Sequence, residues 1–186
     1  MATTLSSPTE PTVGNAIKRA RITLGLGEVI VASKPSIVRT VLGSCVAAIL
    51  HVPRLRISAL CHAQMPERHG DGRCRDSCPH PCFLEAPATN DRKYVTCCVR
   101  HMLHELRRRR VRNDEIVVTL VGGANVLANI DPRWSVASRN VEVAEAMLAQ
   151  TGIVIAYADT GGTRGRVIEH VSDLNHTKVR YHGSER

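Results

Sequence analysis

Two nearly uninterrupted apolar runs, Cys45 to Val52 and Ile57 to Ala63, constrain the fold more than any other feature of the sequence. Short apolar runs bounded by turn residues are typical of strands buried on both faces. Pro53 and Arg54 follow the first run, and so short a connection predicts an antiparallel hairpin. If the chain turns at these two residues, Cys45 lies directly opposite His62.

The remaining patterns predict one mixed α/β domain with a largely antiparallel sheet and about two main helices. Apolar residues make up 43% of 186 residues, which is enough for the core of one domain. A helix with a 3.6-residue apolar period is predicted from Tyr94 to Arg110, and a second from a cap at Ser138 or Asn140 to about Gln150. Further strands are predicted at 25–32, 37–42, 115–121 and 153–158, the last of them buried, and a terminal hairpin at 165–182 turns near Asn175.

Two segments are predicted to lie outside this core. Residues 1–13 are rich in Ser, Thr and Pro and are predicted to be a flexible tail, which leaves 14–186 as the domain. Residues 66–92 are predicted to be a long loop, and they contain Cys74, Cys78, Cys82 and His80. Thiolates and an imidazole at close range can hold zinc, but paired zinc ligands are usually two residues apart rather than three. Free thiols, a structural metal and a redox role all remain open for this loop.

Composition limits where the protein acts and what it binds. No stretch approaches the roughly 18 apolar residues of a membrane span, and the N-terminal segment lacks an apolar signal-peptide centre. Seven cysteines in such a chain predict a reducing compartment, and therefore the cytoplasm. The net charge of +8 favours acidic partners. Nucleic acid is disfavoured because aromatic residues, on which bases stack, are only 3% of the chain. The arginines at 107–110 are interpreted as a solvated helix end.

Cys45 and His62 are the residues most able to carry out chemistry. Residues opposed across an antiparallel pair face the same side, where a thiol and an imidazole can form an activated nucleophile with a nearby acid. Gly43 and Ser44 would let the chain bend and leave amide N–H groups free to hold an oxyanion. The hydroxyl of Thr40 could orient the imidazole or the substrate. The alternative is that Cys45 and His62 are simply core residues.

Asp159-Thr160-Gly161 imitates the aspartic-protease signature. That chemistry needs two carboxyl groups sharing a proton, and the sequence has a single copy of the motif. We therefore interpret it as the end of a strand, where Asp159 could help to order the surroundings of the site.

The segment from Thr40 to Val46, followed by His62 seventeen residues after the cysteine, resembles the CheD family of chemoreceptor glutamine deamidases. The resemblance covers almost the whole chain after the tail. Its further fragments are Gly25-Leu26-Gly27-Glu28, Tyr94-Val95, Gly122-Gly123-Ala124, Arg139-Asn140, Asp159-Thr160-Gly161-Gly162 and Arg166.

This resemblance implies a cysteine hydrolase of CheD-like fold that converts receptor glutamines to glutamates and releases ammonia, without a metal or organic cofactor. It implies that Cys45 is the nucleophile and His62 the base. A threonine before the cysteine completes the family's triad; in some members it lies six positions before the cysteine, where this chain has Arg39, and Thr40 comes one position later. The implied partners are methyl-accepting chemotaxis receptors and the phosphatase CheC. The alternative is a non-catalytic adaptor that binds a receptor or CheC.

Overall fold

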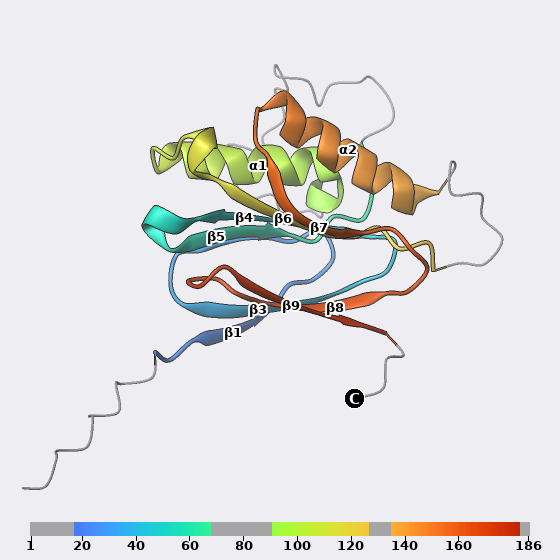
Figure 1. The fold of residues 1–186 in the computed structure, drawn as a ribbon, viewed down its shortest axis with the longest axis horizontal. Helices are drawn as coiled ribbons and strands as arrows, with labels where there is room; N and C mark the ends of the chain where they lie inside the picture. The colour runs from blue at the N-terminus through green and yellow to red at the C-terminus, as the bar shows by residue number, and fades with distance from the viewer. Residues whose placement is uncertain (1–16, 68–90, 127–134, 183–186) are drawn as a thin grey trace, which may run out of the picture.

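The computed structural model describes residues 17–67, 91–126 and 135–182, which form two stacked sheets with both helices on one side (Figure 1). The predicted tail and the cysteines at 74, 78 and 82 lie outside the described residues. The five-stranded sheet has the order β2 (Val29–Ala32), β5 (Ile57–Cys61), β4 (Val46–Val52), β6 (Val117–Gly122) and β7 (Ile155–Thr160). The four-stranded sheet has the order β1 (Ala20–Thr23), β3 (Ser36–Leu42), β8 (Arg166–Val171) and β9 (His176–Tyr181).

The predicted fold class is confirmed. Both sheets are mixed, since β6 pairs with β7 and β1 with β3 in parallel while the other pairs are antiparallel. The strands divide between two sheets, where the sequence pattern predicted one. The alternation of buried and exposed residues along β3 is the mark of this second sheet, because only one of its faces is covered.

The apolar hairpin forms the centre of the molecule. Every residue of β4 and β5 is buried, because the helices cover one face of their sheet and the four-stranded sheet covers the other. Successive side chains of β4 therefore enter two different cores. Val46, Ala48 and Leu50 pack toward the helices, whereas Ala47 and Ile49 pack between the sheets.

The helices α1 (Val95–Arg108) and α2 (Val136–Gln150) lie side by side over the five-stranded sheet (Figure 1). The first was predicted with nearly these bounds, and its basic end is exposed as expected, with Glu105 paired to Arg108 and Arg109. The predicted cap of the second helix is wrong. Ser135 is the cap, and its side chain accepts a hydrogen bond from the Ser138 amide.

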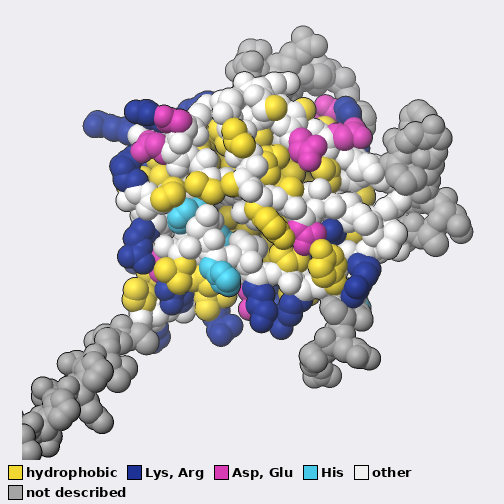
Figure 2. All heavy atoms as spheres, viewed as in Figure 1, with side chains coloured by type: hydrophobic (Ala, Val, Ile, Leu, Met, Phe, Trp, Pro, Cys, Tyr) yellow, Lys and Arg dark blue, Asp and Glu magenta, His cyan; other side chains and the backbone are white. Residues whose placement is uncertain are grey.

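The outer face of the four-stranded sheet is basic. Four basic side chains are exposed on it, those of Arg21, Arg39, Lys178 and Arg180. Figure 2 shows Lys and Arg side chains gathered around this part of the molecule. The strand predicted at 25–32 is shorter than expected, because the chain turns at 25–28 and β2 begins only at Val29. The strand predicted at 153–158, which corresponds to β7, was expected to be buried. It lies at the edge of its sheet, and Tyr157 in it is 53% exposed. The terminal hairpin of β8 and β9 is confirmed, and Asn175 in its turn has a φ of 51°.

Candidate active site

The hairpin that carries Cys45 and His62 forms with a register different from the predicted one. Val46 pairs with Ala63 and Ile49 with Leu60, so that His62 lies opposite Ala47 rather than opposite Cys45. The connection is longer than a two-residue turn, because a 3-10 turn over Pro53–Leu55 is followed by Arg56 in the left-handed region. The register is shifted by two residues, and an even shift leaves every side chain on its predicted face.

Cys45 and His62 therefore face the same side of the sheet as diagonal neighbours, a relation in which Cα atoms are roughly 7–8 Å apart. That side is the space between the two sheets, where Cys45 packs with Ala47 and Leu60. Cys45 is 8% exposed and His62 is 4% exposed. His62 Nε2 is buried and has no hydrogen-bond partner among the described residues. The Cys45 thiol therefore makes no hydrogen bond to this nitrogen in the structure.

Thr40 reaches the imidazole from the opposite sheet. Its Oγ1 lies 2.8 Å from His62 Nδ1, and its hydroxyl donates a hydrogen bond of 2.7 Å to the Leu24 carbonyl. Since the only hydroxyl proton is used on Leu24, the bond to the imidazole must be donated by His62 Nδ1–H. The lone pair of neutral His62 is therefore on Nε2, the nitrogen without a partner. Thr40 occupies the inward face of β3 and Arg39 the outward face, so only Thr40 can make this contact.

Burial keeps both reactive groups neutral at rest. It raises the pKa of the Cys45 thiol, although the residue's own backbone amide partly opposes the shift. It lowers the pKa of His62, and this shift is partly opposed by the Leu24 carbonyl and by the charge of Glu28. A thiol beside a neutral imidazole is thus the resting form, and a thiolate–imidazolium pair would have to be formed when a substrate enters.

The chain bends at Gly43 and Ser44, directly before the thiol. Within the described residues, the amides of Ser44 and Cys45 donate to no other backbone group. Gly43 itself is not required sterically, because an added Cβ would meet Val126 only at 3.7 Å. The glycine that the bend does require is Gly122, which has a φ of 116° and whose added Cβ would lie 2.3 Å from the Cys45 carbonyl oxygen.

An open pocket of about 410 Å³ begins beside this bend. It is lined mainly by Val41, Gly43, Val126 and Arg164. Val41 and Val126 are about half exposed, at 55% and 48%.

Sequence reasoning missed Asn140, which it assigned to a helix cap. Asn140 is fully buried inside α2, and its Nδ2 donates hydrogen bonds of 2.9 Å to the Ser44 carbonyl and 3.0 Å to the Gln64 carbonyl. The signal was its spacing, because Asn140 lies on the same helix face as the buried Ala144 and Leu148. A polar residue on an apolar face needs partners, and here the partners are the two segments that flank the site.

Asp159 is engaged in a structural contact. Arg166, which is 4% exposed, donates from Nε and Nη2 to Asp159 Oδ1 at 3.0 and 2.8 Å, and Tyr181 donates to the same carboxylate. These bonds join β7 of one sheet to β8 and β9 of the other. A carboxylate paired with an arginine is not available to share a proton as in an aspartic protease.

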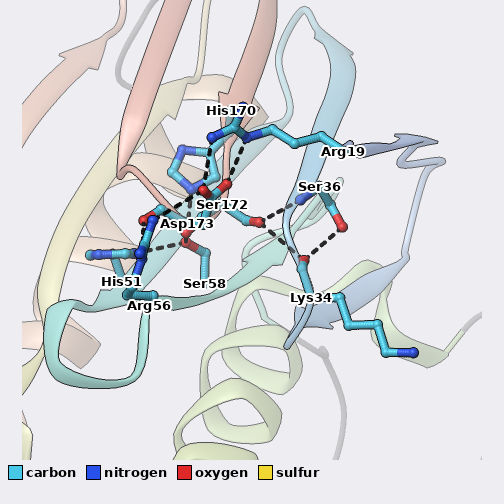
Figure 3. Close-up of polar contacts among 9 residues, drawn as sticks. All are labelled: Arg19, Lys34, Ser36, His51, Arg56, Ser58, His170, Ser172 and Asp173. Carbon is cyan, nitrogen blue, oxygen red and sulfur yellow. Dashed lines mark hydrogen bonds and ion pairs between the residues drawn. The ribbon is translucent and has the colours of Figure 1, made fainter. Parts of the chain in front are cut away.

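A second buried polar cluster lies between the sheets, centred on Ser58 (Figure 3). The Ser58 hydroxyl donates to the Ser172 carbonyl at 2.8 Å, so both imidazoles that contact its oxygen must be donors: His51 Nδ1 at 3.0 Å and His170 Nε2 at 2.9 Å. His170 Nδ1 then accepts from the Thr177 hydroxyl. Every member named here has a partner, and His170 is completely buried, which indicates a structural role.

The part of the chain that the structure describes contains no cluster of three or more His, Cys, Asp or Glu side chains that could hold a metal ion. In the same ranges, no helix is long and apolar enough to cross a membrane. No disulfide is recorded among the four described cysteines, Cys45, Cys61, Cys97 and Cys98. The predicted zinc alternative falls outside the described residues and is not tested.

A thiol and an imidazole on one face, with a hydroxyl fixing the imidazole tautomer, is the kind of arrangement that cysteine hydrolases use. Residues 79–181 match the model of the family described as CheD chemotactic sensory transduction. That match begins after Cys45 and His62.

Curated relatives extend the similarity over more of the chain. The probable chemoreceptor glutamine deamidase CheD 2 of Geobacter sulfurreducens is 34% identical over 149 residues, which cover 80% of this chain and 82% of the relative. The probable chemoreceptor glutamine deamidase CheD of Maridesulfovibrio salexigens is 37% identical over 78% of this chain and 82% of its own. The chemoreceptor glutamine deamidase CheD of Thermotoga maritima is 27% identical over 84% and 89%. The chain belongs to the CheD family.

Proposed function

We propose that this protein is a protein-glutamine deamidase that converts glutamines of chemotaxis receptors to glutamates, with Cys45, His62 and Thr40 as its catalytic residues. The names of its relatives support this activity. The observation that carries the residue assignment is the hydrogen bond of 2.8 Å between Thr40 and His62 Nδ1. That bond leaves a lone pair on Nε2, on the face of the sheet that also carries Cys45.

The first half of the reaction forms a thioester. Cys45 Sγ attacks the side-chain carbonyl carbon of glutamine, and His62 Nε2 takes the thiol proton as the bond forms. The negative charge moves to the carbonyl oxygen, where the amides near Ser44 and Cys45 can hold it. The intermediate collapses when the carbon–nitrogen bond breaks, and the imidazolium gives its proton to the departing ammonia.

The second half releases the product. Neutral His62 takes a proton from a water molecule that attacks the thioester, and the carbon–sulfur bond then breaks. The proton returns to the sulfur, so Cys45 and His62 are neutral again, as burial favours. The glutamine has become a glutamate carboxylate, and no metal or organic cofactor takes part.

We also propose that the protein acts in the cytoplasm and that CheC is a second partner. The described cysteines, which form no disulfide with one another, suit a reducing compartment. A mixture of the protein with purified CheC, analysed by size-exclusion chromatography, tests the partner directly. A new peak containing both proteins supports this interaction, and separate elution at micromolar concentrations rejects it.

The alternative is an adaptor that binds receptors without acting on them. Intact-mass spectrometry of a purified cytoplasmic receptor fragment separates the two functions. A deamidase adds about 1 Da for each converted glutamine, because NH is replaced by O, and the Cys45→Ala variant adds none. An adaptor binds the fragment and leaves its mass unchanged with either protein.

A further inference from the structure

The hydrogen bonds of Asn140 determine which atom of its side-chain amide is the nitrogen and which is the oxygen. Its Nδ2 faces two carbonyl oxygens, those of Ser44 and Gln64. If the amide were turned over, its oxygen would face both of them. Asn140 Oδ1 is buried and has no partner among the described residues, and leaving a buried acceptor without a hydrogen bond is unfavourable.

The bond from Asn140 determines where the Cys45 amide points. In a trans peptide the C=O of one residue and the N–H of the next point in opposite directions, and the described chain has no cis peptide bond. The Ser44 carbonyl points toward α2, so the Cys45 N–H points away from it. The Cys45 side chain also packs away from the helices, in the core between the sheets.

The peptide groups around the bend are held at three successive carbonyls. Ala124 N–H donates to Gly43 O at 2.9 Å, and Gly123 N–H donates to Cys45 O at 2.8 Å. Both of these donors are backbone groups. The carbonyl between them, that of Ser44, receives its bond from the side chain of Asn140. Of these three hydrogen bonds, this is therefore the one that replacing a side chain can remove.

We propose that Asn140 is a positioning residue that fixes the Ser44–Cys45 peptide so that the Cys45 N–H can hold the oxyanion. The proposal rests on the deamidase function proposed above. Asn140 does not touch the substrate, because it lies on the helix side of the five-stranded sheet. It acts through the Ser44 carbonyl, and it joins this carbonyl to that of Gln64, two residues after His62. One side chain thus links the strand ends that carry the nucleophile and the base.

Two reactions of the same sulfur separate this role from a general loss of structure. Deamidation passes through an oxyanion, whereas alkylation of Cys45 by iodoacetamide is a direct displacement that forms none. The variants are Asn140→Leu and Asn140→Asp, which keep the side chain's size while removing the donor. The matched control is Ser135→Ala, which weakens the cap of the same helix and leaves the Ser44 carbonyl bonded. Alkylation is followed at the Cys45 peptide by mass spectrometry.

Because an oxyanion donor is typically worth about 10²–10³ in kcat, we expect kcat for a receptor fragment to fall at least about tenfold in both Asn140 variants, with KM within about twofold of wild type. Alkylation of Cys45 should stay within about twofold, and Ser135→Ala should keep kcat. The inference is overturned if both Asn140 variants deamidate like wild type, if alkylation falls in parallel, if the control loses kcat equally, or if neither Asn140 variant folds. A wild-type protein without deamidase activity rejects the proposed function instead.

Discussion

Acid should destabilise this protein through His170, a residue with no part in the proposed reaction. Burial, assisted by the charges of His51 and His176 and opposed by Asp173, lowers the pKa of His170 from 6.5 to about 4. In the unfolded chain this imidazole takes up a proton below pH 6.5, whereas in the folded protein it stays neutral until about pH 4. Stability is therefore fully present above pH 6.5 and is lost as the pH falls through that window.

The size of the effect follows from the two pKa values. A shift of this size makes the contribution of His170 to the free energy of unfolding about 2 kcal/mol smaller at pH 5 than at pH 7. His51 and His62 also have lowered pKa values and act in the same direction, so the test compares wild type with His170→Gln. Glutamine can still donate to Ser58 but cannot gain a proton.

Urea denaturation at pH 7 and pH 5 provides the measurement. We expect wild type to lose about 2 kcal/mol more than His170→Gln between the two pH values, with an unchanged dependence on urea concentration. If both proteins lose the same free energy of unfolding, His170 is not held neutral by its surroundings and the reasoning fails.

Three further predictions concern the site. Thr40→Val keeps the shape of the side chain but removes the acceptor for His62 Nδ1–H, so kcat for deamidation should fall about tenfold or more in a protein that still folds; unchanged kcat would exclude Thr40 from the site. Gly122→Ala should prevent normal folding because its Cβ meets the Cys45 carbonyl oxygen, whereas Gly43→Ala should fold normally, and identical circular dichroism spectra of the two variants would contradict the structure. Iodoacetamide should alkylate Cys45 in the free protein faster as the pH rises, beyond the range of an ordinary thiol, because burial raises its pKa; a plateau below pH 8 would show a preformed thiolate.

From the sequence alone, it was possible to predict that Cys45 and His62 lie on the same face of the sheet. The register of the two strands was predicted incorrectly. The apolar runs and the proline turn establish a hairpin, and side-chain alternation then limits each residue to one of two faces. The turn could not be read correctly, because its last residue is Arg56 in a left-handed conformation that arginine rarely adopts. The shift was even, so Cys45 and His62 kept a common face.

The contacts that complete the site depend on tertiary structure. Thr40 belongs to a different sheet from His62, and no local pattern indicates that β3 would pack over β5 at this point. Asn140 was interpreted as a cap because asparagine favours helix starts, but its two carbonyl partners come from segments more than seventy residues away. The exposure of β7 was also not predictable, because apolar content alone does not distinguish an edge strand from a central one.

The most direct test of the central claim is to trap the covalent intermediate. A receptor fragment is mixed with the protein, the reaction is quenched in acid within a turnover, and peptides containing Cys45 are analysed by mass spectrometry. We expect a receptor peptide joined to Cys45 through a thioester. This species should be absent from Cys45→Ala, which should also release no ammonia. Ammonia release by Cys45→Ala at the wild-type rate would contradict the role of Cys45 as nucleophile.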